Sequence, residues 1–219
     1  MAYTVLKKRK VSLRELAQNK APITFEKFYE LAEESKKYDL IDGNVIRDAP
    51  VIDKHGRVVA WLVHALMSYV EQFDLGEVLT APVTVRLSNY QGPQPDVLFV
   101  SKQRKHIVLE KYIDGPPDLC IEVTSRSSRK LDRGRKLVLY AEYGVQEYWI
   151  IDPLGNTVDL FENINGEWRL IPPDEQQRLR SKVLPNFWLK AEWLIGATLP
   201  PVKSTIDEIL VTHLTSERH

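Results

Sequence analysis

The sequence predicts a single α/β domain, and three observations support this prediction. Residues 116–153 have the pattern of a buried strand, a polar turn, an amphipathic helix and a second buried strand. Between residues 58 and 73 the apolar side chains recur at helical spacing. The turn signals Asp42-Gly43 and Asn165-Gly166 each lie between short apolar runs and predict two β-hairpins. Helices that alternate with strands in this way are typical of one layered α/β core.

Length and composition fit one soluble core. The chain has 219 residues, of which 27% are charged and 43% are apolar. Lys+Arg and Asp+Glu both total 30, which argues against a non-specific DNA coat but leaves a local basic groove open. The single cysteine, Cys120, excludes an intramolecular disulfide framework and a Cys-rich zinc site, and its apolar strand predicts a core position.

The ends of the sequence predict peripheral segments around one domain. We expect an N-terminal arm over residues 1–20, the folded domain over 21–197, and a tail with a short helix over 198–219. No apolar run reaches the length of a membrane span, and the first residues lack the apolar region of a signal peptide. These features predict a cytoplasmic protein without a membrane partner.

Local patterns predict the elements of the first half. Thr24 is a suitable N-cap for a short helix that ends near Leu31, and two short strands follow within residues 38–50. After the helix of residues 58–73 come strands over 79–87 and 94–100, and then a charged loop with a helical turn over 101–115.

The second half contains the 116–153 unit and a further hairpin. Its first strand includes Leu119–Val123, and a helix is expected from about residue 129 to 142, with Ser127 or Ser128 as its cap and Gly144 at its end. A helical apolar face is expected to pack on the sheet; it comprises Leu137, Val138 and Ala141. Residues 157–173 form the second predicted hairpin, and residues 184–195 are expected to cover the sheet edge.

One carboxylate, Glu122, interrupts the apolar strand of this unit. A buried carboxylate is unfavourable when ionised unless a cation or hydrogen-bond donors meet it. The following helix offers a partner, because Asp132, Lys136 and Tyr140 recur at intervals of four residues and share one face. The alternative is a solvated helix surface and a buried glutamate whose hydrogen bonds serve only the core.

A second carboxylate, Asp96, precedes the strand at residues 97–100. If this strand neighbours that of Glu122, both carboxylates can face one point, as ligands of Mg²⁺ often do. A lysine beside them can orient a water or neutralise charge on a phosphoryl group. Asp96, Glu122 and Lys136 thus form a minimal set for metal-assisted phosphodiester hydrolysis, although such sets also arise by chance.

Three stretches resemble a known family. YDLIDG (38–43), PQPDVLFV (93–100) and IEVTSRSSRKLDRGRKLVLYAEYGVQEYWIIDP (121–153) are similar to the Uma-type restriction endonuclease family of the PD-(D/E)XK nuclease superfamily. The resemblance covers roughly residues 24–195. It implies a restriction-endonuclease-like fold: a mixed central β-sheet flanked by helices, with additional β-hairpins.

The resemblance also implies roles for individual residues. Asp96 and Glu122 would bind Mg²⁺, with Mn²⁺ as an alternative, and the carbonyl of Val123 would add a third oxygen. The superfamily's lysine stands two residues after the glutamate, where this chain has Thr124, so its function would have moved to Lys136. Asp132 would hold Lys136 in place; alternatively, it is an acid favoured by the helix dipole.

Some positions depart from the family pattern. Arg126 replaces a usual proline, and Asp39 and Asn44 stand where the family has glutamates, which leaves a role for the first hairpin undecided. Asp42 is expected to be a turn residue. His55 occupies the family's usual histidine position, but a lone histidine is more often structural than a catalytic base.

Basic and aromatic residues surround the proposed site. We expect phosphate contacts from a basic cluster at the start of the helix, although a solvated helix end is the alternative; the cluster comprises Arg126, Arg129, Lys130, Arg133 and Arg135. The aromatic residues of the second half can stack on bases, but core packing is the favoured use.

Two functional hypotheses follow. The first is a Mg²⁺-dependent DNA endonuclease in which a metal-bound water attacks the scissile phosphate with help from Lys136. The second is a catalytically silent module that keeps the fold for DNA binding or dimeric interaction. The retained Asp96, Glu122 and Lys136 favour the enzyme, and analogy with related nucleases predicts a homodimer.

Overall fold

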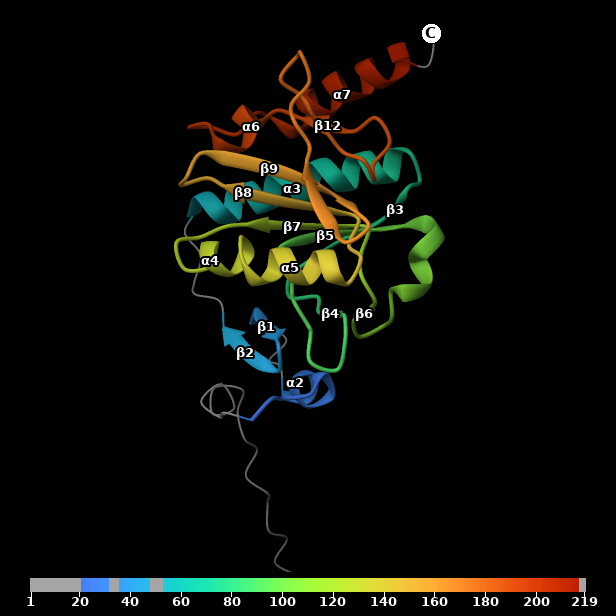
Figure 1. Ribbon diagram of the computed structural model, residues 1–219. Helices are drawn as coiled ribbons and strands as arrows, with labels where there is room; N and C mark the ends of the chain where they lie inside the picture. The colour runs from blue at the N-terminus through green and yellow to red at the C-terminus, as the bar shows by residue number, and fades with distance from the viewer. Residues whose placement is uncertain (1–20, 32–35, 48–52, 217–219) are drawn as a thin grey trace, which may run out of the picture.

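A six-stranded mixed sheet lies at the centre of the computed structural model, which describes residues 21–31, 36–47 and 53–216 (Figure 1). The expected arm over residues 1–20 and the end of the first predicted hairpin, residues 48–50, lie outside these ranges. The strand order is β10-β9-β8-β7-β5-β3. These strands are β3 (Gly76–Thr80), β5 (Val97–Ser101), β7 (Leu119–Val123), β8 (Glu147–Asp152), β9 (Thr157–Ile164) and β10 (Glu167–Leu170).

The middle of the sheet confirms the strand–helix–strand unit. β7 and β8 pair in parallel, with Leu119 opposite Glu147, and the helical segment between them connects their ends. β5 pairs antiparallel with β7, so the strands that follow Asp96 and contain Glu122 are neighbours. Every residue of β7 and β8 is buried, as expected for strands covered on both faces.

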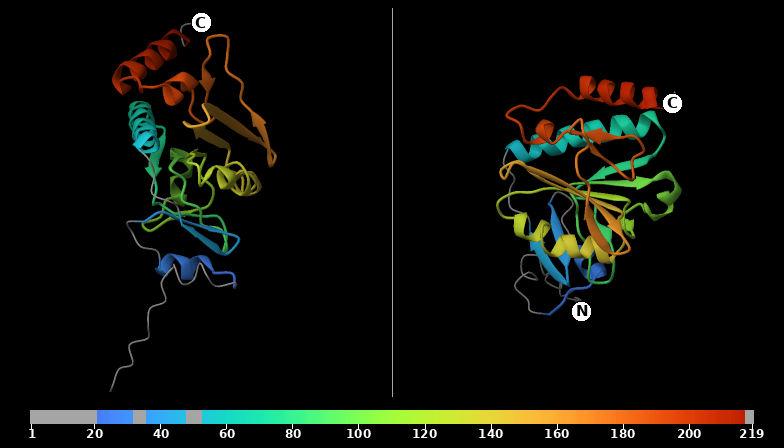
Figure 2. Two further views of the ribbon diagram at one scale, coloured as in Figure 1. Left: turned by 90° about the vertical axis from the view of Figure 1, so that its left-hand side faces the viewer. Right: turned by 45° about the horizontal axis from the view of Figure 1, so that its top comes forward.

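Helices cover both faces of the sheet (Figure 2). On one face, α3 (Asp53–Gln72) packs against β3, β5 and β7, and α7 (Val202–Ser216) packs on α3. Trp149 and Phe187 join this main core. On the opposite face, Tyr140 of the helical segment stacks edge-on against Tyr148 of β8. The mixed sheet flanked by helices that the resemblance implied is therefore the observed fold.

The helix expected over residues 129–142 is broken. It forms α4 (Arg129–Asp132) and α5 (Arg135–Glu142), with Gly134 between them at φ −117° and ψ −97°. A Cβ atom at Gly134 would lie 2.6 Å from the carbonyl oxygen of Lys130, so only glycine allows this close approach. Gly144 ends the segment with a positive φ of 82°, as predicted.

Two details of this helical segment differ from expectation. Ser128 occupies the N-cap position of α4, but its side chain makes no capping hydrogen bond. The buried face of α5 contains Lys136, Leu139, Tyr140 and Ala141, whereas Val138, expected on the apolar face, is 47% exposed. The buried face of α5 is centred on Lys136, Leu139 and Tyr140, at intervals of three and four residues, and Val138 lies on the other side of the helix.

Both predicted hairpins form. In the first, β1 (Tyr38–Ile41) and β2 (Asn44–Arg47) pair across a turn in which Asp42 and Gly43 have φ values of 51° and 70°. Positive φ at both turn residues matches the right-handed twist of the strands. In the second, β9 and β10 turn at Asn165 and Gly166. The short helix α2 (Phe25–Leu31) begins after Thr24, whose hydroxyl accepts a hydrogen bond from the amide of Lys27 at 3.4 Å.

The region between α3 and β7 corrects one prediction. Residues 79–87 form no single strand: β3 ends at Thr80, a cis Ala81–Pro82 bond follows, and β4 is only Val85–Arg86. β4 pairs in parallel with β6 (Ile113–Asp114) away from the main sheet. The expected helical turn in the charged loop is present as the 3₁₀ helix η1 (Lys102–Ile107).

The C-terminal region contributes more to the hydrophobic core than the sequence predicted. β11 (Leu179–Arg180), β12 (Trp188–Leu189) and α6 (Ala191–Ile195) lie over β8 and β9, and therefore cover a face of the sheet instead of its edge. The segment expected as a tail forms α7, whose Ile206 and Ile209 belong to the main core. No helix within the described ranges is long and apolar enough to cross a bilayer.

Candidate active site

Strand register brings Asp96 and Glu122 together. Val97 pairs with Ile121 in the antiparallel β5–β7 ladder, which puts the preceding Asp96 opposite Glu122. The backbone amide of Val123 donates a hydrogen bond to Asp96 Oδ2 at 2.8 Å. The main chain of Val123 thus adjoins both carboxylates, and the three residues expected to bind metal occupy one place at the end of β7.

Lys37 lies between the two carboxylates. Its Nζ is 2.8 Å from Asp96 Oδ1 and 3.5 Å from Glu122 Oε2. Lys37 immediately precedes β1, and its side chain is 18% exposed, compared with 7% for Asp96 and 2% for Glu122. The ammonium therefore bridges the two acids on the side that opens to solvent.

Lys136 meets Glu122 from the opposite, buried side. Its Nζ donates to Glu122 Oε1 at 2.8 Å, and the Tyr140 hydroxyl donates to the same oxygen at 3.0 Å. Asp132 Oδ1 lies 3.8 Å from Lys136 Nζ. The predicted helix face of Asp132, Lys136 and Tyr140 is confirmed, because α5 packs directly over β7. The Lys136 side chain is only 1% exposed, so its contacts are with protein groups.

The first hairpin, whose role the sequence left undecided, contributes a further acid to the cluster, Asp39. Asp39 Oδ2 lies 2.8 Å from Lys136 Nζ, and its other oxygen accepts a hydrogen bond from the Gln94 amide at 2.7 Å. Gln94 also accepts a hydrogen bond from the amide of Tyr38 at 2.8 Å. These contacts attach β1 to the start of β5 and fix both Asp39 and Lys37 relative to the sheet.

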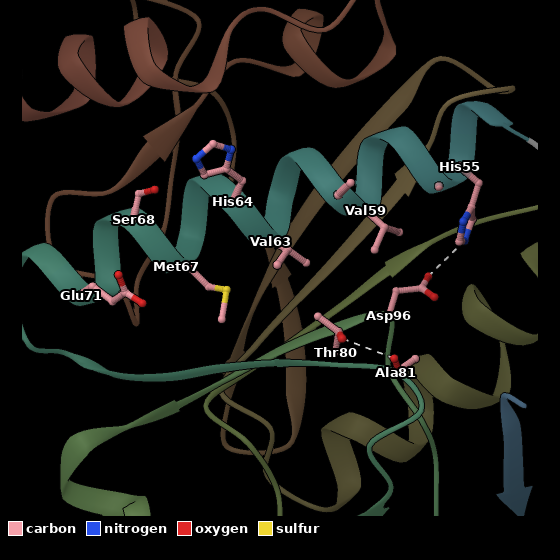
Figure 3. Close-up of a pocket in the computed structure, with 12 residues that line it drawn as sticks. His55, Val59, Val63, His64, Met67, Ser68, Glu71, Thr80, Ala81 and Asp96 are labelled. Carbon is pink, nitrogen blue, oxygen red and sulfur yellow. Dashed lines mark hydrogen bonds and ion pairs between the residues drawn. The ribbon is translucent and has the colours of Figure 1, made fainter. Parts of the chain in front are cut away.

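An open pocket of about 800 Å³ leads from solvent to Asp96 (Figure 3). Apolar side chains of α3 form one wall, including Val59, Val63 and Met67. At the inner end, His55 Nε2 lies 3.3 Å from Asp96 Oδ2. His55 therefore joins the charged cluster through Asp96.

Burial and neighbouring charges shift the pKa values of the buried acids in opposite directions. Burial raises the pKa of Glu122 to about 8, although Lys136 and Lys37 oppose this rise. Burial likewise raises the pKa of Asp132 to about 6. Burial alone would raise the pKa of Asp96 as well, but Lys37 and His55 hold it well below its usual value. Asp96 is thus the firmly ionised member, whereas Glu122 and Asp132 lack sufficient positive charge around them.

The donor set fits a hydrated divalent cation. Asp96 Oδ1 and Glu122 Oε2 both face one cation, the Lys37 ammonium, so the site already has the geometry of cation binding. Over the described ranges, no three or more His, Cys, Asp or Glu residues form a metal cage. Mg²⁺ needs only one or two carboxylates because it keeps several waters.

Thr124, at the superfamily's lysine position, is buried with its hydroxyl unpartnered among the described residues.

Structural ion pairs engage part of the predicted phosphate-binding cluster. Arg129 pairs with Asp152 through Nε and Nη2, at 2.6 and 2.8 Å, and Arg133 pairs with Asp159 at 2.7 Å. Both pairs hold α4 against β8 and β9. Arg126 and Lys130 are exposed and form no ion pair with the described residues. They are the members of the cluster available for a ligand.

Sequence reasoning missed Lys37, although a signal was present. Lys37 and Asp39 are two residues apart at the start of a strand, and a period of two puts both side chains on one face. Nothing local shows that this face meets Glu122, because Gln94 and the sheet impose that contact. Arg135, placed with the basic cluster, instead forms a two-point ion pair with Asp42, at 2.7 and 2.6 Å, and anchors the hairpin turn to α5.

Comparison with known proteins gives this site a family context. A family model named Uma2, described as "Putative restriction endonuclease", matches residues 25–192, which include every residue of the cluster. The chain belongs to this family. An uncharacterized protein of Synechocystis sp., slr1290, is 25% identical over 151 residues, which cover 67% of this chain and 77% of that protein.

A solved structure shares the fold of this Uma2 family member. The crystal structure of a "putative nuclease belonging to DUF820" from Anabaena variabilis has a TM-score of 0.66 at 20% identity. The match covers 80% of this chain and 98% of the other. The family description supports a nuclease function, and the solved structure shows the shared fold.

Proposed function

We propose that this protein is a Mg²⁺-dependent DNA endonuclease that hydrolyses phosphodiester bonds, with Mn²⁺ as an alternative cation. The observation that supports this best is the convergence of Asp96 Oδ1 and Glu122 Oε2 on one position beside the end of β7, which the Lys37 ammonium occupies. DNA is the proposed substrate because the family description names restriction endonucleases.

The proposed role of each side chain depends on how deeply it is buried. Asp96 and Glu122 would hold the cation, with the carbonyl of Val123 as a further donor. The cation would supply charge neutralisation at the phosphate and lower the pKa of a water. Lys136 is too deeply buried to contact a phosphate, so we assign it the positioning of Glu122. Asp132 contacts Lys136 and the Tyr140 hydroxyl donates to Glu122, and both contacts lie on the buried side of the site.

The substrate would approach over the exposed basic side chains. Arg126 and Lys130 flank the start of α4, soon after β7 in the chain. α4 lies on the same side of the molecule as the N-terminal end of α3 (Figure 1). Arg129 and Arg133, already paired with Asp152 and Asp159, would support this surface through α4. Such contacts would make DNA binding weaken with rising salt.

Plasmid nicking with Mg²⁺ or Mn²⁺ tests the proposal. We expect Asp96→Asn to lower the cleavage rate at least about 100-fold, because it removes charge stabilisation at the reacting centre. Asp118→Asn is the matched control, since Asp118 is an equally buried acid that pairs with Arg104 at the other end of β7. Cleavage that persists in Asp96→Asn, or is lost equally in the control, would contradict the proposal.

We also infer a homodimer, by analogy with related nucleases, which commonly pair to cut both strands of a duplex. Sedimentation equilibrium of the full chain measures this. A monomeric mass at concentrations where DNA is cleaved would contradict the dimer but leave the endonuclease assignment standing. A cytoplasmic location remains a prediction.

A further inference from the structure

Lys37 occupies an unusual position for a lysine in a nuclease-like site. Its ammonium does not lie beside the acidic pair but between its members, in contact with Asp96 Oδ1 and Glu122 Oε2. The remaining oxygens are engaged elsewhere: Asp96 Oδ2 accepts the Val123 amide, and Glu122 Oε1 accepts Lys136 and Tyr140. The two oxygens that face Lys37 are therefore the pair left to hold a cation.

The two lysines differ in how they can leave their positions. Lys136 is enclosed by Asp39, Glu122 and Asp132 and is 1% exposed, so α5 would have to move before it could withdraw. Lys37 is 18% exposed and is carried by the residue just before β1. A lysine side chain has a flexible four-carbon stem, so a change of rotamer can carry the Lys37 ammonium away from the two acids.

Charge also favours exchange at this position. Among the described residues, four carboxylates (Asp39, Asp96, Glu122 and Asp132) face the two ammonium groups of Lys37 and Lys136, and His55 Nε2 lies 3.3 Å from Asp96 Oδ2. A divalent cation in place of the Lys37 ammonium reduces the excess negative charge. A cation added beside a retained Lys37 would instead lie within a few ångströms of a like charge.

We propose that Lys37 and the divalent cation compete for one position, so that the Lys37 ammonium holds Asp96 and Glu122 together until the metal displaces it toward solvent. This inference rests on the proposed function, because it assumes that Asp96 and Glu122 bind the cation. It assigns Lys37 the role of an internal counter-ion, distinct from the positioning role of Lys136.

Calorimetric titration of the full chain with Mn²⁺ tests this competition. We expect Lys37→Met to bind Mn²⁺ at least tenfold more tightly than the wild-type protein. Lys36→Met is the matched control, because it removes the same charge from the adjacent exposed residue, and its affinity should equal that of the wild type. Equal or weaker binding by Lys37→Met would overturn the proposal. If neither wild type nor variant binds Mn²⁺, the metal-dependent function itself fails.

A second measurement on the wild-type protein avoids any folding defect of the variant. Reductive methylation followed by mass spectrometry reports the accessibility of each lysine amine. We expect Mn²⁺ to increase the methylation rate of Lys37 several-fold and to leave that of Lys36 unchanged. If Mn²⁺ binds but methylation of Lys37 stays constant or falls, Lys37 is not displaced and the competition is refuted.

Discussion

At the scale of the residue, the site depends on how buried acids obtain counter-charge. Lys136 contacts Asp39 and Glu122 at 2.8 Å and has no exposed route to water. Two acids have raised pKa values in spite of this contact, Glu122 to about 8 and Asp132 to about 6, mainly through burial. The cluster is thus already short of positive charge, and each ammonium group strongly affects stability.

Replacing Lys136 should therefore destabilise the fold severely. We expect Lys136→Met to lower the free energy of unfolding by about 3–5 kcal/mol, because it leaves buried acids without their cation. Added Glu122→Gln should recover part of that loss, since it removes one of the stranded charges. Urea denaturation of both single variants and the double variant measures the coupling. Strictly additive losses would show that the pair does not interact as described.

At the scale of the element, the first hairpin is held to the rest of the fold by backbone and side-chain contacts. β1 and β2 form a separate two-stranded sheet. The backbones of Leu40 and Gly92 exchange hydrogen bonds at 3.1 and 2.7 Å, and Gln94, Gln91 and the Asp42–Arg135 pair add side-chain contacts. The hairpin carries both Lys37 and Asp39, so its attachment determines the geometry of the charged cluster.

Loss of the Arg135 contact should loosen this hairpin selectively. Asp42 is about half exposed, so we expect Arg135→Ala to lower the global stability by only about 0.5–1 kcal/mol. Hydrogen exchange of the amides of β1 and β2 should accelerate, while the amides of β7 and β8 keep their protection. Arg135→Lys should restore little, because a lysine cannot make the two-point contact. Uniform acceleration across the sheet would contradict a local anchor.

At the scale of the whole molecule, the C-terminal helix belongs to the same cooperative unit as the sheet. α7 packs on α3, and Ile209, which is 0% exposed, lies in the main core with Trp149 and Phe187. α3 in turn carries His55 to Asp96. The expected boundary at residue 197 therefore does not separate the core from a peripheral tail.

A core substitution in α7 tests whether this helix unfolds together with the sheet. We expect Ile209→Ala to lower the free energy of unfolding by about 2–5 kcal/mol, as is usual for a large buried aliphatic side chain. Unfolding should remain one transition when followed by tryptophan fluorescence and by circular dichroism. Val211→Ala is the control on the same helix, because Val211 is 62% exposed. Two separate transitions would show that α7 unfolds independently.

Local sequence patterns predicted those site residues whose positions follow from the regular spacing of strands and helices. Asp96 and Glu122 could be placed together because their strands were recognisable, and Lys136 followed from helical spacing with Asp132 and Tyr140. The break at Gly134 was not anticipated, although a glycine inside a helical pattern is a known warning. The period of two that Lys37 shares with Asp39 puts both side chains on one face, but it does not show what that face contacts. The contact of Lys37 with Glu122 spans 85 residues and depends on the docking of a hairpin.

The same sequence separation affects how the protein is made. At roughly 5–20 residues per second, a ribosome needs about 4–17 s to extend the chain from Lys37 to Glu122, and longer to reach Lys136. During synthesis the hairpin exists without its acceptor strand and without the helix that neutralises Asp39. An unfinished polypeptide consequently lacks the assembled cluster of Lys37, Glu122 and Lys136.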